Sequence, residues 1–308
     1  MKEEIFPTKE FTPIKTSYPY KMALFGDMGT VVPAGGFVTN HLEKFHDSNR
    51  LDLIFHIGDL AYAGTGQKWE FEFLWDVFGR QLEPLSSKIP YVTGVGNHEK
   101  YYDYGAYRNR YDKPQNGDKT FYFSYDVGHF HFVSASSEHP FQIGSEQWNW
   151  INQDMNDAYQ RGQKIIFAAH RPMYSSEIRA HTMKELQANI EPLLRTYNVV
   201  LYFSGHMHCY ERTSPITNLN TYKKVDENQR VFHTGGDLKN ATMHLTVGTG
   251  GAWVYQDFND NDWSILHREN FGFGVLTMLN KTALHFGMYE TFHHSDTPVD
   301  EFYIIYTE

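Results

Sequence analysis

Residues 21–29, KMALFGDMG, join a short apolar run to a Gly-Asp pair, and this arrangement recurs along the chain. An apolar run of this length predicts a buried strand, and the glycine after it predicts a sharp turn at the carboxyl end of the strand. Four later runs also end in polar motifs: LDLIFHI (51–57), IPYVTGV (89–95), KIIFAA (164–169) and VVLYF (199–203). The sequence therefore predicts polar side chains at the ends of five strands.

The stretches between these runs predict helices, because their apolar residues recur at helical spacing. They span residues 37–49, 69–82, 145–161 and 183–197. Strands that alternate with helices predict βα units around a mostly parallel sheet. Residues 120–136 break this rhythm and predict an antiparallel hairpin with Gly128 near its turn.

The last third of the chain returns to strand-like patterns, at residues 244–250 and 272–289. We predict an α/β (α+β) fold with a β-sandwich core flanked by helices, in which these C-terminal strands complete the second sheet. One domain would occupy residues 21–308. A linker-like segment would precede it, at residues 1–20.

Composition and charge limit the classes of function. The 308 residues carry 27 Lys and Arg against 37 Asp and Glu, a formal net charge of -10. A protein that binds nucleic acid through its phosphates needs a basic face, so we expect neither a nucleic-acid nor a membrane partner. The apolar runs are too short to span a bilayer, and the charged start of the chain is unlike a signal peptide.

The cysteine count and two short triplets bear on the compartment. Cys209 is the single cysteine, so any disulfide would have to join two chains, for example in a homodimer. One cysteine fits a reducing compartment but also many secreted enzymes. Asn240 and Asn280 each begin an N-x-[ST] triplet, a weak indication of a secretory route. These observations leave the compartment open.

Each predicted strand end carries side chains of a kind that metals bind. The motifs are Gly26-Asp27, Gly58-Asp59-Leu60-Ala61-Tyr62, Gly96-Asn97-His98-Glu99, His170 and Gly205-His206-Met207-His208. Loops at the carboxyl ends of strands converge on one crevice in α/β proteins. Carboxylate, amide, imidazole and phenolate groups suit a pair of hard-to-borderline metal ions, which clamp a phosphoryl group and activate water. The motifs therefore favour hydrolysis of a phosphoester.

Each motif taken alone has a plainer explanation. Gly-Asp and Gly-Asn-His-Glu both suit turn geometry, and the chain has a second Gly-His-x-His at residues 128–131. That copy precedes an apolar run instead of following one, so we interpret His129 and His131 as structural. The order of five motifs at five successive strand ends is what favours a common site.

Together the motifs resemble the metallophosphoesterase superfamily and, within it, the purple acid phosphatases. The resemblance runs from Asp27 to Arg212, and TVGTGG at residues 246–251 is similar to the family's C-terminal region. Most members of the wider superfamily begin with Asp-x-His, whereas Asp27-Met28-Gly29 has no histidine. Tyr62 resembles the residue that takes this vacant coordination position, and a phenolate favours trivalent iron.

The resemblance implies a role for each motif residue. Asp59 would bridge two metal ions. The ligands of an Fe(III) ion would be Asp27, Tyr62 and His208. The ligands of a divalent Zn, Mn or Fe ion would be Asn97, His170 and His206.

Three further residues are candidates for the site beside this ligand set. His98 would contact the phosphate and protonate the leaving group as general acid. His181 resembles a substrate-contacting histidine of the family, with a plain helix-start residue as an equal alternative. Cys209 stands next to a ligand, but we interpret it as a small apolar residue and not as a thiolate ligand.

The implied activity is that of an acid phosphatase. A metal-bound hydroxide would attack a phosphate monoester of a small molecule or protein, at acidic pH because His98 must be protonated. Two alternatives stay open: a phosphodiesterase or nucleotide pyrophosphatase on the same two-metal scaffold, and a metal-binding module without activity. The resemblance also implies a secreted, lysosomal or vacuolar glycoprotein, longer than this chain by an N-terminal domain whose linker ends near residue 20.

Overall fold

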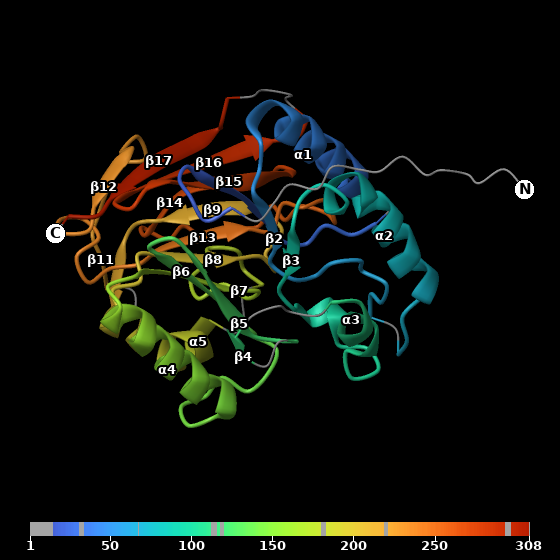
Figure 1. The fold of residues 1–308 in the computed structure, drawn as a ribbon, viewed down its shortest axis with the longest axis horizontal. Helices are drawn as coiled ribbons and strands as arrows, with labels where there is room; N and C mark the ends of the chain where they lie inside the picture. The colour runs from blue at the N-terminus through green and yellow to red at the C-terminus, as the bar shows by residue number, and fades with distance from the viewer. Residues whose placement is uncertain are drawn as a thin grey trace, which may run out of the picture.

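The computed structural model describes residues 15–30, 34–66, 68–111, 116–117, 120–179, 183–218, 221–292 and 297–307. Two β-sheets pack together at the centre of this described part, and helices cover their outer faces (Figure 1). The predicted α/β sandwich flanked by helices is confirmed. Residues 1–14 of the predicted linker lie outside the described residues, and Tyr20 already belongs to the first strand.

The first sheet has seven strands in the order β12-β17-β16-β15-β1-β2-β3. Within it β1, β2 and β3 are parallel, and β15 pairs antiparallel with β1 in the register Tyr20↔Met278. The strand bounds are β1 (Tyr20–Phe25), β2 (Leu53–His56), β3 (Tyr91–Thr93), β12 (Val231–His233), β15 (Gly272–Asn280), β16 (Ala283–Glu290) and β17 (Asp300–Ile305).

The second sheet has eight strands in the order β14-β9-β13-β8-β7-β6-β5-β4. Its central strands β6, β7, β8 and β13 are parallel, with antiparallel strands on both sides. The strand bounds are β4 (Asn116–Gly117), β5 (Phe123–Val127), β6 (Phe130–Ala135), β7 (Lys164–Ala169), β8 (Leu201–Ser204), β9 (Tyr210–Thr213), β13 (Met243–Val247) and β14 (Ser264–Arg268). A separate ribbon joins β10 (Ile216–Asn218) to β11 (Thr221–Tyr222).

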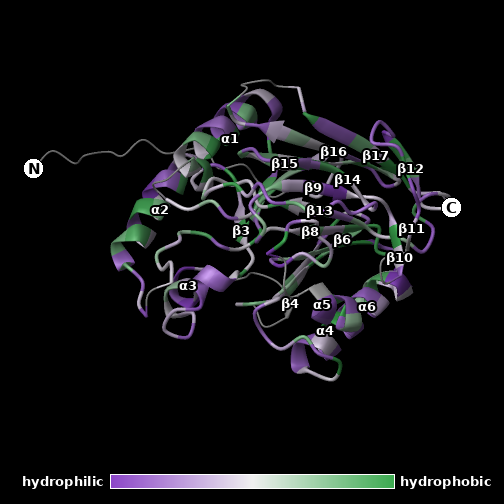
Figure 2. Ribbon diagram, turned by 180° about the vertical axis from the view of Figure 1, so that it is seen from behind, coloured by the Kyte–Doolittle hydropathy of each residue, from purple (hydrophilic) through white to green (hydrophobic). Residues whose placement is uncertain are grey.

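Helices cover the outside of both sheets, with α1 and α2 beside the first sheet and α4 and α5 beside the second (Figure 1). Their bounds are α1 (Gly35–Asn49), α2 (Glu72–Ser86), α3 (Gly105–Arg110), α4 (Glu146–Gln160), α5 (Met183–Asn189), α6 (Glu191–Thr196) and a short 3-10 turn, η1 (Asn97–Glu99). Polar and apolar colours alternate along α1, α2 and α4 in Figure 2, as expected for helices with one buried face.

The sequence predicted the five core strands and the 120–136 hairpin correctly, with three differences elsewhere. The predicted helix at 183–197 is two helices, because Pro192 lacks the N–H that a continuous helix would need there. The helix predicted from Trp69 begins at Glu72. The C-terminal strands complete both sheets and not only the second, since β15, β16 and β17 extend the first sheet beside β1.

Aromatic side chains and one buried ion pair hold the two sheets together. Phe55 of β2 meets Phe132 of β6 with ring centroids 5.0 Å apart, and Phe203 of β8 meets Phe286 of β16 at 5.9 Å. Full burial of each such ring stabilises the fold by roughly 2 to 3 kcal/mol. The Arg212 guanidinium of β9 donates to the Asp300 carboxylate of β17 at 2.7 Å, with both side chains fully buried. Removing either partner would leave an unpaired buried charge, which is strongly destabilising.

The parallel strands place the polar motifs at one edge of the sandwich. Asp27 follows β1, Asp59 follows β2 and Asn97 follows β3 in the first sheet, while His170 follows β7 and His206 follows β8 in the second. Because both sheets present carboxyl ends on the same side, the five loops meet there. Within the described ranges, no helix combines the length and apolarity needed to cross a bilayer.

Candidate metal centre

Hydrogen bonds from backbone N–H groups tie four of the five loops together. The Asp27 N–H donates to the Gly58 carbonyl at 3.1 Å, and the Gly205 N–H donates to the His170 carbonyl at 2.9 Å. The His206 N–H crosses from one sheet to the other and donates to Asp27 Oδ2 at 2.7 Å. The motif side chains therefore project from a connected frame.

Four motif residues adopt left-handed backbone conformations, with φ of 64° at Asp27, 52° at Asp59, 49° at Tyr62 and 67° at His206. This region is uncommon for residues with a Cβ and costs of order 1 to 3 kcal/mol each. Such strain persists where surrounding structure enforces it, and it collects at functional sites. Here it turns four candidate ligands inward.

Two of the predicted Fe(III) ligands and the predicted bridge surround the hydroxyl of the third predicted ligand, Tyr62. The Tyr62 hydroxyl lies 3.1 Å from Asp27 Oδ1, 3.2 Å from Asp59 Oδ2 and 2.8 Å from His208 Nε2. A phenol has a single proton to donate, so it can satisfy only one of three acceptors at a time. A cation at this point would satisfy all four groups together.

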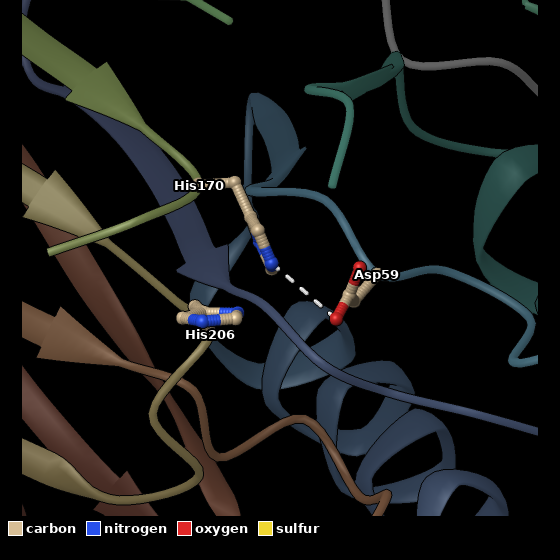
Figure 3. A group of neighbouring side chains, drawn as sticks. All are labelled: Asp59, His170 and His206. Carbon is tan, nitrogen blue, oxygen red and sulfur yellow. Dashed lines mark ion pairs between the residues drawn. The ribbon is translucent and has the colours of Figure 1, made fainter. Parts of the chain in front are cut away.

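Asp59 also belongs to a second group, on the side of the second sheet. His170 Nε2 lies 3.3 Å from Asp59 Oδ2, and one ligand atom each of Asp59, His170 and His206 fall within 4.8 Å of one another (Figure 3). In Figure 3 the three side chains come from three different loops and point toward one another. Asp59 thus lies between two groups of donors, as a bridging carboxylate must.

Asn97 begins η1, next to Asp59. The following N–H, of His98, donates to Asp59 Oδ1 at 2.8 Å. The Asn97 carboxamide oxygen is buried without a hydrogen-bond partner among the described residues. An unpartnered buried acceptor is costly, and a metal ion is one way to satisfy it. The donor types and this unpartnered oxygen fit the pair of metals that the sequence predicted.

His98 lies at the rim of the centre. Its ring packs against Tyr62 with centroids 4.3 Å apart, and its Nε2 lies 3.9 Å from Asp59 Oδ2. Its Nδ1 meets the Gly64 carbonyl at 2.9 Å. A carbonyl only accepts, so Nδ1 carries a proton and Nε2 faces the centre. His98 Nε2 therefore faces the centre, and its role as an acid stays a prediction, while His181 lies outside the described residues.

Burial and charge set the protonation of this cluster. Burial alone would lower the pKa of His170, but the Asp59 carboxylate raises that pKa by more, to about 10. A bound cation would take the place of the proton that His170 shares with Asp59. Burial, aided by the charges of His170 and Arg171, holds the pKa of His206 well below its usual value. His206 is thus neutral, the form that binds metals.

Glu99 ends the Gly96-Asn97-His98-Glu99 motif, and the sequence alone indicates no role for it. Its buried carboxylate accepts from the backbone N–H groups of Asp59, Leu60 and Gly96 at 2.8 to 2.9 Å. Burial and the charge of Asp59 raise the pKa of Glu99 to about 8. Glu99 locks the Asp59 loop to the Asn97 loop, so it supports the ligands without touching the centre.

Arg171 was missed entirely, although it directly follows His170. Its Nη1 donates to His206 Nε2 at 2.9 Å. The other edge of its guanidinium donates to both carboxylate oxygens of Glu138, at 2.7 and 2.9 Å. The only signal in the sequence was adjacency to a ligand, and adjacency does not say where a long side chain points.

Two aromatic residues of the C-terminal region form a wall beside His208. Trp253 and Tyr255 each lie with ring centroids 4.6 Å from the His208 ring, and Tyr255 is stacked at 8°. The Arg179 guanidinium lies over the Tyr255 ring, 4.5 Å from its centroid. Cys209, which follows His208, is fully buried. Burial raises the pKa of its thiol far above the usual range, so Cys209 is a neutral apolar side chain.

The chain matches two protein families along most of its length. The calcineurin-like phosphoesterase family matches residues 20–210, and the iron/zinc purple acid phosphatase-like C-terminal family matches residues 241–301. The first of these covers all five motif loops, and the second covers the aromatic wall.

Individual relatives agree with these families. Probable inactive purple acid phosphatase 27 of Arabidopsis thaliana is 29% identical over 100% of this chain and 54% of its own length. A nucleotide pyrophosphatase/phosphodiesterase of Hordeum vulgare is 28% identical over 94% of this chain and 83% of its own length. Purple acid phosphatase PPD1 from yellow lupin superposes with a TM-score of 0.78 at 28% identity, over 96% of this chain and 55% of that one.

The chain spans about half the length of the first curated relatives that it matches. Its matched region nevertheless includes every motif loop and both sheets. The fold, the convergent motif side chains and the two family matches lead to one assignment. The chain belongs to the calcineurin-like phosphoesterase family, within its purple acid phosphatase branch.

Proposed function

We propose that this chain hydrolyses phosphate monoesters at a pair of metal ions held by its seven motif residues. One observation carries the proposal: Asp59 Oδ2 lies within 3.3 Å of both Tyr62 and His170, so a single carboxylate joins two donor groups of different character. A bridged metal pair of this kind is a recurrent device for attack on phosphoesters.

Under this proposal the two ions differ. Fe(III) would be held by Asp27, Tyr62 and His208, and a divalent Zn, Fe or Mn by Asn97, His170 and His206, with Asp59 between them. Burial, followed by the charges of Asp27 and Asp59, raises the pKa of Tyr62 well above its usual value. A phenolate would therefore form here only beside a compensating positive charge such as a metal ion.

When bound, the two ions would offset negative charge on the phosphoryl oxygens and lower the pKa of a water molecule. The chain supplies the remaining parts. The Gly64 carbonyl holds the His98 ring so that Nε2 faces the centre, and a proton on Nε2 would pass to the departing oxygen. An imidazole acts as an acid only when protonated, so we expect activity to be highest at acidic pH.

The test uses the full chain loaded with iron and zinc. We expect kcat/KM for p-nitrophenyl phosphate to exceed that for bis(p-nitrophenyl) phosphate, with turnover lost on chelation. The inverse ratio would establish the second candidate, a phosphodiesterase or nucleotide pyrophosphatase, which the similarity to the Hordeum vulgare protein supports.

A third candidate is a metal-binding module without turnover, because one similar protein is named a probable inactive purple acid phosphatase. The presence of all seven donor residues and of His98 argues for an active centre. Two bound metals per chain without hydrolysis of either ester would establish the inactive module instead.

The proposed setting is secreted, lysosomal or vacuolar. Asn240 and Asn280, which begin the two glycosylation triplets, are both exposed. Expression through a secretory route should add glycans that an N-glycosidase removes, seen as a mobility shift. Cys209 is buried in the monomer, so a homodimer would form without a disulfide at that position.

A further inference from the structure

Arg171 is held rigidly beside the centre. Its backbone N–H donates to Ser137 Oγ at 3.0 Å, and its carbonyl accepts from the Tyr202 hydroxyl at 2.8 Å. The outer edge of its guanidinium donates two hydrogen bonds to the Glu138 carboxylate. Only 19% of the Arg171 side chain and 9% of the Glu138 side chain are exposed. The inner edge, Nη1, is thereby directed at His206.

The hydrogen bond from Arg171 Nη1 to His206 Nε2 must break when His206 binds a metal. A guanidinium only donates, so His206 Nε2 is the acceptor. If His206 binds a metal through Nε2, its lone pair goes to the metal. If it binds through Nδ1, the proton of the neutral ring moves to Nε2. In both cases Nε2 no longer accepts a hydrogen bond from Arg171. The N–H groups of Nη1 then face the centre without that acceptor.

A partly buried guanidinium edge that lacks an acceptor needs an anion or water. Phosphate oxygens are its best partners, because the planar fork matches their geometry. Arg171 is also a permanent cation in contact with a predicted ligand side chain. We propose that Arg171 binds a non-bridging phosphoryl oxygen of the substrate in the metal-loaded protein. This proposal rests on the proposed phosphoesterase function and adds a substrate-binding residue to it.

The probe is inorganic phosphate, titrated calorimetrically into the iron- and zinc-loaded full chain. We expect Arg171→Gln to keep both metals, by elemental analysis, and to weaken phosphate binding by roughly 10- to 100-fold, the range for one hydrogen bond to a charged group. Arg110→Gln is the matched control, because Arg110 pairs with Glu72 and not with a motif residue. Its phosphate affinity should equal that of the wild type.

Two results would overturn the proposal. Unchanged phosphate affinity in Arg171→Gln with both metals retained would show that Arg171 does not meet phosphate. Loss of the divalent metal in that variant would show that Arg171 acts by positioning His206. If Arg171→Gln fails to fold, Arg171→Lys is the second variant to test. A lysine ammonium cannot contact Glu138 and a phosphate at the same time. We expect Arg171→Lys to weaken phosphate binding by at least about 3-fold, and wild-type affinity would overturn the proposal.

This outcome is separable from that of the proposed function. A wild-type protein that hydrolyses no ester, yet binds phosphate through Arg171, would remove the function and leave the binding site. A wild-type protein that hydrolyses monoesters, with phosphate affinity independent of Arg171, would do the reverse.

Discussion

The chain contains the same four-residue pattern, Gly-His-x-His, in two regions with opposite surroundings. At residues 205–208 the pattern follows β8, and His208 meets Tyr62 and Asp27 at 2.8 and 3.3 Å. At residues 128–131 it begins in the turn between β5 and β6, where Gly128 adopts a φ of 59°, and continues into the start of β6. The first copy faces other loops, and the second faces its own hairpin and a helix.

The partners of the second copy explain why it is structural. His131 Nδ1 meets Asp126 Oδ1 at 2.6 Å and His131 Nε2 meets Asp154 Oδ2 at 2.8 Å. Both ring nitrogens are therefore engaged by carboxylates, so the ring has no lone pair to offer. His129 is exposed and contacts Tyr18. The comparison teaches that the motif acquires its chemistry from the end of the strand that carries it.

The most severe test of this contrast removes the carboxylate shared by the two donor groups. Asp59→Ala should abolish binding of both metals and reduce hydrolysis to background, because each ion loses a ligand at once. Elemental analysis and p-nitrophenyl phosphate turnover measure the two effects. Asp126→Ala, beside the second copy of the motif, should keep both metals. Two tightly bound metals in Asp59→Ala would refute the bridging role.

A change at Tyr62 should affect one ion. If its phenolate binds Fe(III), ring-to-metal charge transfer gives the protein a purple to violet colour, as the family resemblance implies. Tyr62→Phe keeps the ring volume and should fold, but it should lose the visible band. Tyr18→Phe, which contacts the second copy of the motif, should keep it. Full colour in Tyr62→Phe would mean that Tyr62 serves only in packing.

Replacing His98 should affect neither ion. We expect His98→Ala to retain metals and to lower kcat by about 100- to 10,000-fold, the usual contribution of a positioned acid. The loss should be larger for alkyl phosphates than for p-nitrophenyl phosphate, whose leaving group departs without a proton. Equal losses on both substrates would argue that His98 only binds phosphate.

Where side chains are short, the sequence alone was enough to predict where the functional groups lie. Asp27, Asp59 and Asn97 lie two, three and four residues beyond a strand end, so the position of the strand nearly determines that of the functional group. The alternation of strands and helices was likewise enough for the fold class. The ligand roles of these residues remain predictions that the variants above examine.

Long side chains and contacts between distant segments could not be predicted in this way. Arg171 reaches back to Glu138 and across to His206, and neither direction follows from its place in the chain. Trp253 comes to His208 only because β13 lies between β8 and β9. The division of C-terminal strands between the sheets also depends on pairing across more than 200 residues, which local patterns do not encode.

Replacing His131 should have the smallest effect on catalysis. Its expected effect is on the stability of the fold, because His131 belongs to the second copy of the motif. Burial lowers the pKa of His131, but hydrogen bonds and charge from Asp154 and Asp126 raise it by more, so the net pKa is above the usual value. A pKa raised in the folded state stabilises the protein fully below the unfolded value, about 6.5, and this contribution is lost as pH rises through the folded pKa. The imidazolium then joins Asp126 of β5 to Asp154 of α4, with Arg161 3.8 Å from Asp126 on the far side.

His131→Gln should therefore lower the free energy of unfolding by on the order of 3 kcal/mol at pH 5, because it leaves the buried Asp154 carboxylate without its cation. The deficit should shrink as the pH rises above the folded pKa, since the wild type then loses the same charge. His129→Gln, two residues away in the same motif, is exposed and should change stability by less than about 0.5 kcal/mol. Urea unfolding at a series of pH values measures all three proteins, and metal content should equal that of the wild type in both variants. A deficit independent of pH would mean that His131 contributes packing alone, and loss of metal from His131→Gln would contradict the separation of the two regions.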